Sequence, residues 1–475
     1  MQFDSIPFVI FLTGIIVAYY LIRGGTWKQL LLIGAAVFFI TQANLFSLLL
    51  ISLITVATYF LGIEIEKRRE TNSGSLIFLF AVILIIANLF FFKYYNFFNQ
   101  NLDRIFSLFH ATTPLPYIHV LFPLGLSFYT FSVLGYLIDV HVEKVGAERN
   151  IIVFLNYIFF FPKLMAGPIE RAQHFLPQVR EEKKLLWKNF SVGGKLIIWG
   201  FFQKLVIADR VSIYVDSIYA DPTQHSRVTI LVCMVLYTFQ IYADFSGYTD
   251  IARGIARLFG YVLMQNFRRP LLATSITMFW RRWHISLSSW VNDYIFTPLV
   301  LKYRNLGLPG IVLALFISFV IFGIWHGALW TWVLFGLLQG LFLSIELLTT
   351  TRRKALYTHF PKKIIKILGL ICTFTLITIS LVLVRSPSLH SAVIFFSRLT
   401  AGGGLSLQNS GMFVFGLFGI AVLILRSTLQ EFLRKDILKI KSRFFLVRSL
   451  PYAALIIVIL LIGVFNGGQF IYLRF

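Results

Sequence analysis

Long apolar runs alternate with short polar segments along most of the chain, and this pattern predicts membrane-spanning helices. A helix needs about 20 largely apolar residues to cross a bilayer. The candidate spans are 8–22, 29–44, 46–63, 75–95, 121–139, 151–166, 192–208, 228–243, 310–325, 328–348, 364–384, 411–426 and 452–465. Because some of these runs are short, the pattern predicts about 11 to 13 transmembrane helices in an all-α fold. No internal repeat or soluble domain interrupts them, so residues 1–475 are expected to form one membrane-embedded domain.

Composition and charge agree with a polytopic membrane protein. The chain is 58% hydrophobic and 13% charged, with a mean hydropathy of +0.79, whereas ordinary soluble chains carry about 25% charged residues. The formal net charge is +23. In a membrane protein such an excess gathers in cytoplasmic loops and beside anionic headgroups. We therefore expect lipid, and not nucleic acid, as the partner of these basic residues.

Basic clusters beside the first and third apolar runs predict the orientation. Arg23 and Lys28 follow the first run, and Lys67 to Arg69 follow the third. Both clusters are expected in the cytoplasm, which places the N-terminus outside. The first run has no basic segment before it and is expected to be a retained span rather than a cleaved signal.

Two histidines stand in tryptophan-rich segments, His284 in 279–290 and His326 in 323–330. An ionisable side chain at membrane depth is costly and marks a functional site by default. Histidine also accepts and returns protons near neutral pH. These segments favour an enzyme. The alternatives are an interfacial amphipathic helix around His284 and a histidine hydrogen-bonded between packed helices at 326.

Polar neighbours of His284 suggest how a site there would be built. On a helix, Arg281 and Ser288 share a face with His284. Arg281 could hold an anionic group and Ser288 could orient the imidazole, whereas the Arg281–Arg282 pair with Trp283 also suits an interfacial anchor. Beside His326, the small residues Gly327 and Ala328 allow close approach of a backbone or ligand.

Two aspartates and one helix break are further candidates. Asp244 follows an apolar stretch and is expected either to pair with a basic residue in 268–282 or to end a helix in water. Asp293 could orient an arginine or histidine. Gly167 and Pro168 break an apolar run, as in helices that line membrane cavities, although an ordinary helix end is an equal alternative.

Several common site patterns are missing from the sequence. We find no phosphate-binding loop, dinucleotide fingerprint, zinc-protease motif or serine-hydrolase elbow. The two histidines have no nearby thiols or paired carboxylates, so no metal site is expected. No permanently bound cofactor is expected either.

Short motifs in order along the chain resemble those of a known family. They are Gly125–Phe131 with Tyr136–Val140; Phe160–Pro162 with Ala166–Ile169, Arg171 and Leu176–Gln178; Tyr237–Tyr242 with Asp244–Tyr248; Asn266–Phe267, Pro270 and Phe279–Ser288; Trp325–Ala328; and the ending Phe470–Phe475. The chain thereby resembles the membrane-bound O-acyltransferases, and among them the bacterial alginate O-acetyltransferase type, most strongly over about 120–345. It departs from the family at Asn292 and around 299–305.

This resemblance implies a ring of helices around a central membrane-embedded site in the bacterial inner membrane. His326 would be the catalytic base, and His284 would position the substrate or polarise the thioester carbonyl. The surrounding residues would be Asp244, Arg281, Arg282, Trp283, Ser288, Asp293 and Trp325. The donor would be a cytoplasmic acyl thioester, either acetyl-CoA or an acyl carrier protein. The acceptor would be an extracytoplasmic polysaccharide such as alginate, acetylated with a serine-esterase-like extracytoplasmic partner.

Two alternatives remain at this point. Within the family, the chain could transfer D-alanine from an acyl carrier protein to teichoic acid. In another class, it could be a polysaccharide or small-molecule transporter, which predicts an internal repeat and charges spread through several spans. Here the polar residues cluster in one region instead.

Overall fold

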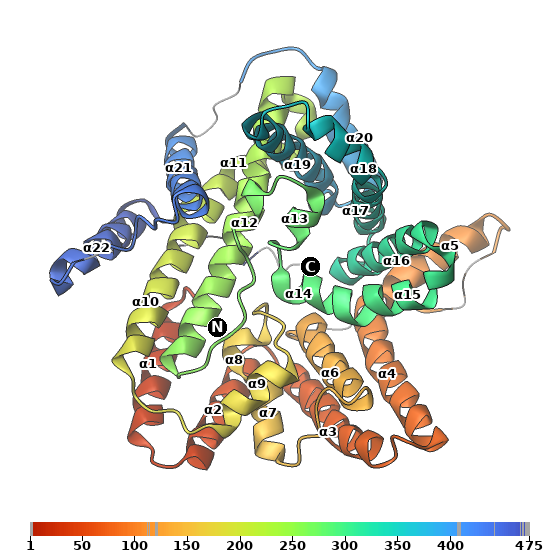
Figure 1. The fold of residues 1–475 in the computed structure, drawn as a ribbon, viewed down its shortest axis with the longest axis vertical. Helices are drawn as coiled ribbons and strands as arrows, with labels where there is room; N and C mark the ends of the chain where they lie inside the picture. Colours follow the sequence, from red (N-terminus) through yellow and green to blue (C-terminus); the bar gives the residue numbers. More distant parts are fainter. Residues whose placement is uncertain are drawn as a thin grey trace. The chain divides into compact units, whose positions relative to one another are not determined.

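The computed structural model describes residues 3–111, 113, 115–118, 122–405, 410–440, 442–465, 467 and 470. Regular structure in these residues is entirely helical, which confirms the all-α prediction (Figure 1). Several helices begin at polar residues whose side chains bind the first free backbone N–H groups. Asn44 accepts from Ser47 N at 2.6 Å, and Ser275 accepts from Met278 N at 3.1 Å. Such caps satisfy donors that a helix leaves open at its start.

Eight helices among the described residues are long and apolar enough to cross a membrane, and two shorter apolar helices precede them. The eight spans are Leu45–Lys67, Asn72–Lys93, Arg227–Leu258, Leu308–His326, Trp330–Leu348, Lys362–Arg385, Phe413–Phe432 and Phe445–Ile462. The shorter helices are α1 (Ile6–Leu21) and α2 (Gly25–Thr41). The chain is therefore a multi-pass membrane protein.

Three predicted spans differ in form from simple crossing helices. The run 121–139 gives α6 (Leu126–His141), and 151–166 is broken into α7 (Ile151–Phe159) and α8 (Phe161–Leu164). Pro162 at the start of α8 and the turn at Gly167 account for this break, because proline cannot continue a helix with a normal hydrogen bond. The run 192–208 lies within a longer helical stretch whose middle is a π-helix, η1 (Phe202–Ala208).

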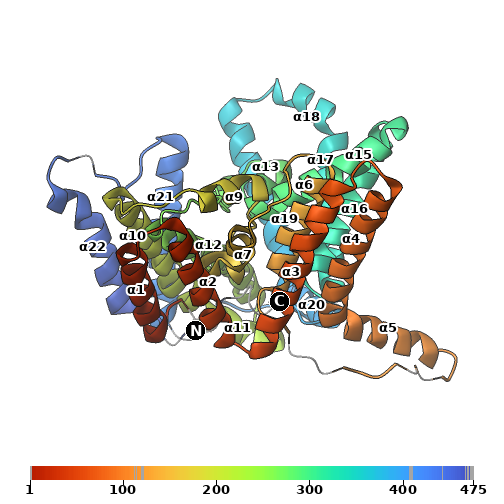
Figure 2. The same ribbon diagram turned by 90° about the horizontal axis from the view of Figure 1, so that it is seen from below.

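The chain divides into two compact units, which are described separately. The first comprises residues 1–193 and 255–264. In it α3 (Leu45–Lys67) packs on α4 (Asn72–Lys93) and α6, and α2 packs on α7 (Figure 2). The unit also holds α5 (Tyr95–Ser107) and α9 (Ala172–Arg180).

The ends of α3 and α6 in this unit lie together, held by polar contacts. Glu66 accepts from Ala147 N at 2.8 Å and pairs with Arg149, and Arg69 pairs with Glu143 at 3.1 Å. The basic residues after α3 and the polar loop after α6 therefore share one face of the unit. The positive-inside rule predicts that this face is cytoplasmic.

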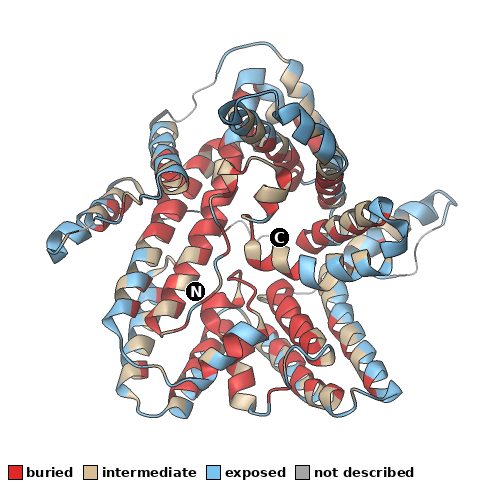
Figure 3. Cartoon of the chain, in the orientation of Figure 1, coloured by how far each residue is buried: buried red, intermediate tan, exposed pale blue. Residues whose placement is uncertain are grey.

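The second unit comprises residues 194–254 and 265–475 and contains both candidate histidines. Its helices are α10 (Trp187–Phe201, from Gly194 on), α11 (Asp209–Ala220), α12 (Arg227–Leu258, up to Gly254), α13 (Ile276–Trp280), α14 (Ile285–Val291), α15 (Thr297–Lys302), α16 (Leu308–His326), α17 (Trp330–Leu348), α18 (Thr350–Tyr357), α19 (Lys362–Arg385), α20 (Leu389–Ser397), α21 (Ser410–Phe432) and α22 (Phe445–Ile462). Within the unit α12 is mostly buried, whereas α22 exposes most of its residues (Figure 3). Apart from Arg448 near its start, the exposed residues of α22 are apolar, as expected where a helix faces lipid.

Short elements between α12 and α16 carry the first histidine. They are 3₁₀ turns at Pro270–Leu272 and Arg304–Leu306, a π-helix η4 at Asn292–Phe296, and the helices α13 to α15. Up to Leu258 the chain is still part of α12. The predicted span 228–243 is thus too short, because the polar residues after Tyr242 face partners inside the protein.

Candidate functional site

His326 is the last residue of α16 and lies in a tight hairpin with α17. A Cβ at Gly323 would collide with the carbonyl oxygen of Trp332, and one at Gly336 would collide with that of Phe319. Only glycine therefore allows the two backbones to approach this closely. A Cβ at Gly327 would collide with the Trp332 indole. The close approach expected beside His326 is thus made by Trp332.

Aromatic rings surround the buried His326 imidazole. The ring is stacked on Trp332, with centroids 5.0 Å apart and planes 12° apart, and it meets the edges of Phe322 and Trp325 at 4.6 and 4.5 Å. The residue is only 4% exposed. These contacts hold one ring orientation in an apolar environment that excludes bulk water.

A small hollow of about 20 Å³ lies against His326. Apart from the histidine, its lining consists of apolar and aromatic side chains: Ile241, Phe279, Trp280, Trp283, Phe322, Trp332, Phe335, Ile377, Leu381 and Val384. Tryptophans from the segments around both histidines are thus part of its wall. His284 is not in the lining of this hollow.

His284 is held by a different kind of local structure. It stands at the N-terminus of α14 with a left-handed backbone, φ 44° and ψ 52°, a conformation that costs L-residues energy. Its Nδ1 lies 3.1 Å from Asn266 Oδ1. The same oxygen accepts from the backbone N and the hydroxyl of Ser286 at 3.1 and 2.9 Å. One amide oxygen therefore fixes both the imidazole and the start of α14.

The predicted role of Ser288 is wrong. Its hydroxyl donates to the carbonyl oxygen of Trp283 at 2.9 Å, and Asn266 holds the imidazole instead. The cause is the left-handed turn at His284, which ends the helical spacing on which the prediction relied. His284 is also fully buried, at 0% exposure, so the alternative of an interfacial helix is not supported at this residue.

The two histidines are connected through Trp325. Its ring lies 6.4 Å from that of His284 and 4.5 Å from that of His326, measured between centroids. Phe245 on α12 meets His284 edge-on at 4.7 Å. The sequence segments around 284 and 326 therefore form one aromatic cluster, and Trp325 is its link.

Asp244 lies in the middle of α12, buried, and not at a water-exposed helix end. It pairs with Lys204 on η1 at 2.8 Å. The expected pairing with a basic residue in 268–282 is therefore wrong. Lys204 also pairs with Asp209 at 2.9 Å and lies 4.3 Å from the Phe470 ring centroid. Because α12 continues to Leu258, Asp244 lies inside the helix, where its side chain contacts η1. Of the predicted ending motif, residues 471–475 lie outside the described residues.

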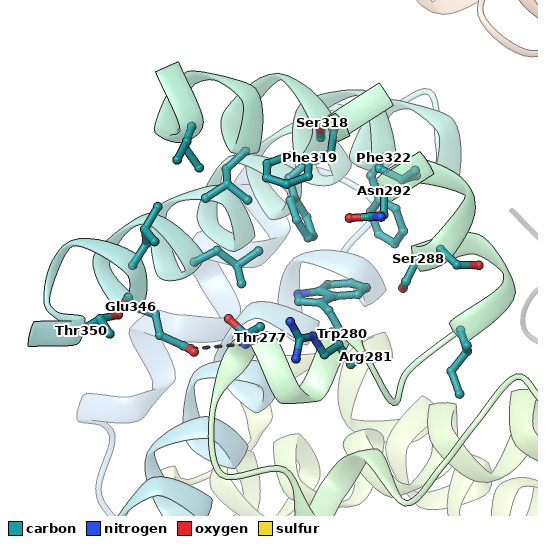
Figure 4. Close-up of a pocket in the computed structure, with 18 residues that line it drawn as sticks. Thr277, Trp280, Arg281, Ser288, Asn292, Ser318, Phe319, Phe322, Glu346 and Thr350 are labelled. Atoms are coloured by element: carbon teal, nitrogen blue, oxygen red, sulfur yellow. Dashed lines mark hydrogen bonds between the residues drawn. The ribbon is translucent and has the colours of Figure 1, made fainter. Parts of the chain in front are cut away.

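Arg281 lines a second, larger cavity of about 700 Å³ (Figure 4). The α16 side of this cavity is Ile311, Leu315, Ser318, Phe319 and Phe322. Positions spaced in this way form one face of a helix, and they extend about 16 Å at 1.5 Å per residue. The cavity therefore follows α16 and reaches Phe322, one helical turn before His326.

Polar groups gather at the other end of this cavity. Glu346 accepts from Ile276 N at 2.8 Å and Thr277 N at 3.3 Å, which anchors α13 to α17. Thr350, also in the lining, begins α18, which carries Arg352, Arg353 and Lys354. The exposed Arg281 guanidinium is in the same lining. The positive-inside rule predicts that this end faces the cytoplasm.

The remaining predicted residues have structural or surface positions. Arg282 donates to Glu431 Oε1 at 2.8 Å, and Arg269 donates to Glu431 Oε2 at 2.6 Å, so Glu431 joins the segments on both sides of α13 to α21. Trp283 is stacked on Phe279 at 5.4 Å. Asp293 is exposed on η4, where it accepts from Asn292 Nδ2 at 3.1 Å.

Sequence reasoning assigned no role to Asn266, Gln339 or Lys204. Gln339 is a single polar residue and Lys204 follows Gln203, in both cases inside a long apolar run, and this was the signal that could have found them. No group of three or more histidine, cysteine or acidic residues suited to a metal ion occurs in the part of the chain that the structure describes.

Comparison with known proteins finds relatives over most of the chain. The model of the membrane-bound O-acyltransferase family matches residues 36–384. The probable alginate O-acetylase AlgI of Pseudomonas aeruginosa is 32% identical over 419 residues, covering 86% of this chain and 76% of its own length. The peptidoglycan O-acetyltransferase of Helicobacter pylori is 31% identical over 80% and 75% of the two chains. The teichoic acid D-alanyltransferase of Bacillus subtilis is 28% identical over 58% and 69%.

Proposed function

Because the chain belongs to the membrane-bound O-acyltransferase family, we propose that it transfers acetyl groups from a cytoplasmic thioester to hydroxyls of an extracytoplasmic polysaccharide. The observation that carries this proposal is His326, buried beside a small hollow that shares two lining residues, Trp280 and Phe322, with a long cavity. Basic residues lie near the polar end of that cavity, as expected for a cytoplasmic face. The relatives named for O-acetylation cover 80% and 86% of the chain, whereas the D-alanyltransferase covers 58%. This difference favours acetyl over D-alanyl transfer.

The larger cavity suits the arm of an acyl thioester donor. Its lining is apolar along α16, at Leu315, Phe319 and Phe322, and includes polar groups at Arg281, Asn292 and Glu346. An extended arm would place apolar atoms along α16, and the Arg281 guanidinium would bind a phosphate at the mouth. Acetyl-CoA and the phosphopantetheine arm of an acyl carrier protein share this chemistry, and both are donors under the proposal.

His326 would act as general base in the transfer. It would take the proton of an acceptor hydroxyl as the oxygen attacks the thioester carbonyl carbon. The new carbon–oxygen bond forms, the carbon–sulfur bond breaks, and the proton held by His326 goes to the leaving thiolate. Charge on the carbonyl oxygen needs a fixed donor in a site without water. His284, held by Asn266, is proposed to position the substrate or to serve as that donor.

The direction of transfer requires an acceptor outside and a donor inside. The described residues of the chain form membrane helices and their connections, and none of the elements described resembles a polymer-binding domain. We propose that a serine-esterase-like extracytoplasmic partner completes transfer to the polymer. The donor thioester, the membrane lipid and this partner are the interactions that the function needs.

A labelled-donor experiment tests the proposal. Inside-out membrane vesicles that contain the full chain and its partner receive radiolabelled acetyl-CoA outside, and the polymer is examined for alkali-labile acetyl esters. We expect label on the polymer that depends on the chain. Label from D-alanyl carrier protein but not from acetyl thioesters would replace acetyl by D-alanyl transfer. Unmodified polymer crossing the membrane without label would instead favour a transporter.

A further inference from the structure

The cavity that follows α16 and the hollow at His326 are separated by two aromatic side chains. Trp280 and Phe322 belong to the lining of both spaces. Their rings meet edge-on with centroids 4.9 Å apart. A group that moves from the large cavity toward His326 must therefore pass this pair.

Trp280 is fixed by a buried chain of hydrogen bonds. Its indole Nε1 donates to Gln339 Oε1 at 3.2 Å, and Gln339 Nε2 donates to Ser380 Oγ at 2.9 Å. Ser380 in turn donates to the carbonyl oxygen of Ile377 at 2.8 Å. Gln339 and Ser380 are both fully buried, and buried polar groups resist losing such bonds. The Trp280 indole on α13, which forms part of the wall between the two spaces, is thus held in place by hydrogen bonds that reach α17 and α19.

The hollow has the size and chemistry of a site for one small apolar group. Its volume of about 20 Å³ is close to the space that a single water needs, but a buried water also needs two to four polar partners. His326 and the ring N–H groups of three tryptophans are the polar groups in a lining that is otherwise apolar. A sugar or an amide-containing donor arm placed there would leave polar groups unsatisfied, which is costly. A methyl group would not.

We propose that this hollow receives the methyl end of the acyl group and restricts the donor to acetyl. The inference rests on the proposed function and adds the residues that set acyl length: Trp280 and Phe322, which the hollow shares with the larger cavity, and Ile377, Leu381 and Val384 of α19. While the methyl occupies the hollow, the carbonyl carbon lies beside His326, where the acceptor oxygen bonds to it and the thiolate leaves. Longer chains have no room, because each added methylene meets close-packed side chains.

A pair of leucines on α19 provides a matched test. Leu381 lines the hollow, whereas Leu383, buried on the same helix, does not. Full-length Leu381→Ala and Leu383→Ala, each together with the extracytoplasmic partner, are compared with the wild type in detergent, with alginate oligosaccharide as probe acceptor. Acetyl, propionyl and butyryl groups are each offered as CoA and phosphopantetheine thioesters, and initial rates of thiol release and ester formation are measured.

We expect Leu381→Ala to raise the butyryl-to-acetyl rate ratio by roughly tenfold or more, since one methylene in an apolar pocket changes discrimination by roughly 10- to 200-fold. Leu383→Ala should keep the wild-type ratio. An unchanged ratio in folded Leu381→Ala, or an equal change in Leu383→Ala, overturns the inference. If the wild type transfers no acyl group from any thioester, the proposed function fails with it.

A variant that fills the hollow decides the matter if Leu381→Ala does not fold. Val384→Ile adds one methyl group toward the hollow, and well-packed sites accept such additions poorly. We expect acetyl transfer to fall roughly tenfold, while the affinity for CoA alone, which measures binding at the cavity mouth, is unchanged. Acetyl transfer at the wild-type rate in Val384→Ile would contradict an acyl group in this hollow.

Discussion

The two histidines of the second unit differ in what holds them and in what they face. His326 ends a regular transmembrane helix, its ring is held by aromatic contacts, and it borders a hollow. His284 stands in a left-handed turn, its ring nitrogen is hydrogen-bonded to Asn266, and its neighbours fill the space around it. Both are buried, so burial alone does not distinguish a residue that reacts from one that supports the reaction.

Free space beside a side chain is the better guide to its role. A general base must approach the proton that it takes to within hydrogen-bond distance, which requires room for a substrate atom. His326 has such room, whereas His284 is built into the start of α14 through the oxygen that also binds Ser286. We therefore expect replacements at 326 to affect chemistry and replacements around 284 to affect both stability and chemistry.

The largest expected effect is the loss of transfer in His326→Ala. A general base contributes roughly 10²- to 10⁴-fold to a rate, so acetyl transfer should fall by at least the lower figure while the protein still inserts and purifies normally. The exposed His359→Ala is the control, with wild-type rates. Wild-type acetylation by well-expressed His326→Ala would remove this residue from the mechanism.

The next largest effect is expected for Asn266→Ala, which tests whether Asn266 holds the His284 imidazole in place. It removes the acceptor for the imidazole and for Ser286 N and Oγ. A buried donor left without its partner costs about 1–3 kcal/mol, so thermal unfolding in detergent should occur at lower temperature. We also expect kcat to fall more than KM rises. If neither stability nor kcat changes, Asn266 does not hold the ring.

Backbone conformation at 284 predicts an unusual order of substitutions. Asparagine tolerates the left-handed region better than alanine does. His284→Asn should therefore be more stable than His284→Ala by about 1 kcal/mol, although both lose the imidazole. At 326, where the backbone is helical, alanine should be at least as stable as asparagine. Melting curves of the four variants would show whether this reversal between the two sites exists.

The smallest expected effects are those of Ser286→Ala and Ser288→Ala on α14, and they distinguish the roles of the two serines. Ser286→Ala loses one bond to Asn266 and should cost about 0.5–1.5 kcal/mol, with a measurable fall in kcat. Ser288→Ala loses a bond to a backbone carbonyl at a half-buried position, and its stability should stay within about 0.5 kcal/mol of the wild type. Equal losses in the two variants would return Ser288 to a place in the site.

The sequence predicted more of the architecture than of the local geometry. Apolar runs are long-range signals, so the helical membrane fold and the importance of the segments around 284 and 326 could be derived from them. The role given to Ser288 failed because no pattern in the sequence announces a left-handed residue at His284. The partner of Asp244 was missed because it lies 40 residues away, and only packing brings such positions together.

Asn266, and not Ser288, is hydrogen-bonded to the His284 imidazole, and this shows the physical limit of prediction from helical spacing. Helical spacing decides which neighbours share a face only while the helix is continuous. At His284 helix α14 begins, and Asn266, from the non-helical segment before α13, lies beside the ring. A functional residue at such a boundary can therefore take its partner from a segment outside its own helix.

The ion pair between Lys204 and Asp244 has a consequence for how the chain enters the bilayer during synthesis. A lysine or aspartate at the centre of a lone helix opposes insertion by about 2.5–3.5 kcal/mol. Lys204 and Asp209 emerge from the ribosome before Asp244 exists, so at that moment their helix carries a charged pair that lacks its second carboxylate. The helical stretch that ends at Ala220 and the following α12 must therefore leave the insertion machinery as a pair. A single substitution at Asp244 would then reduce the yield of inserted protein before it could affect any reaction.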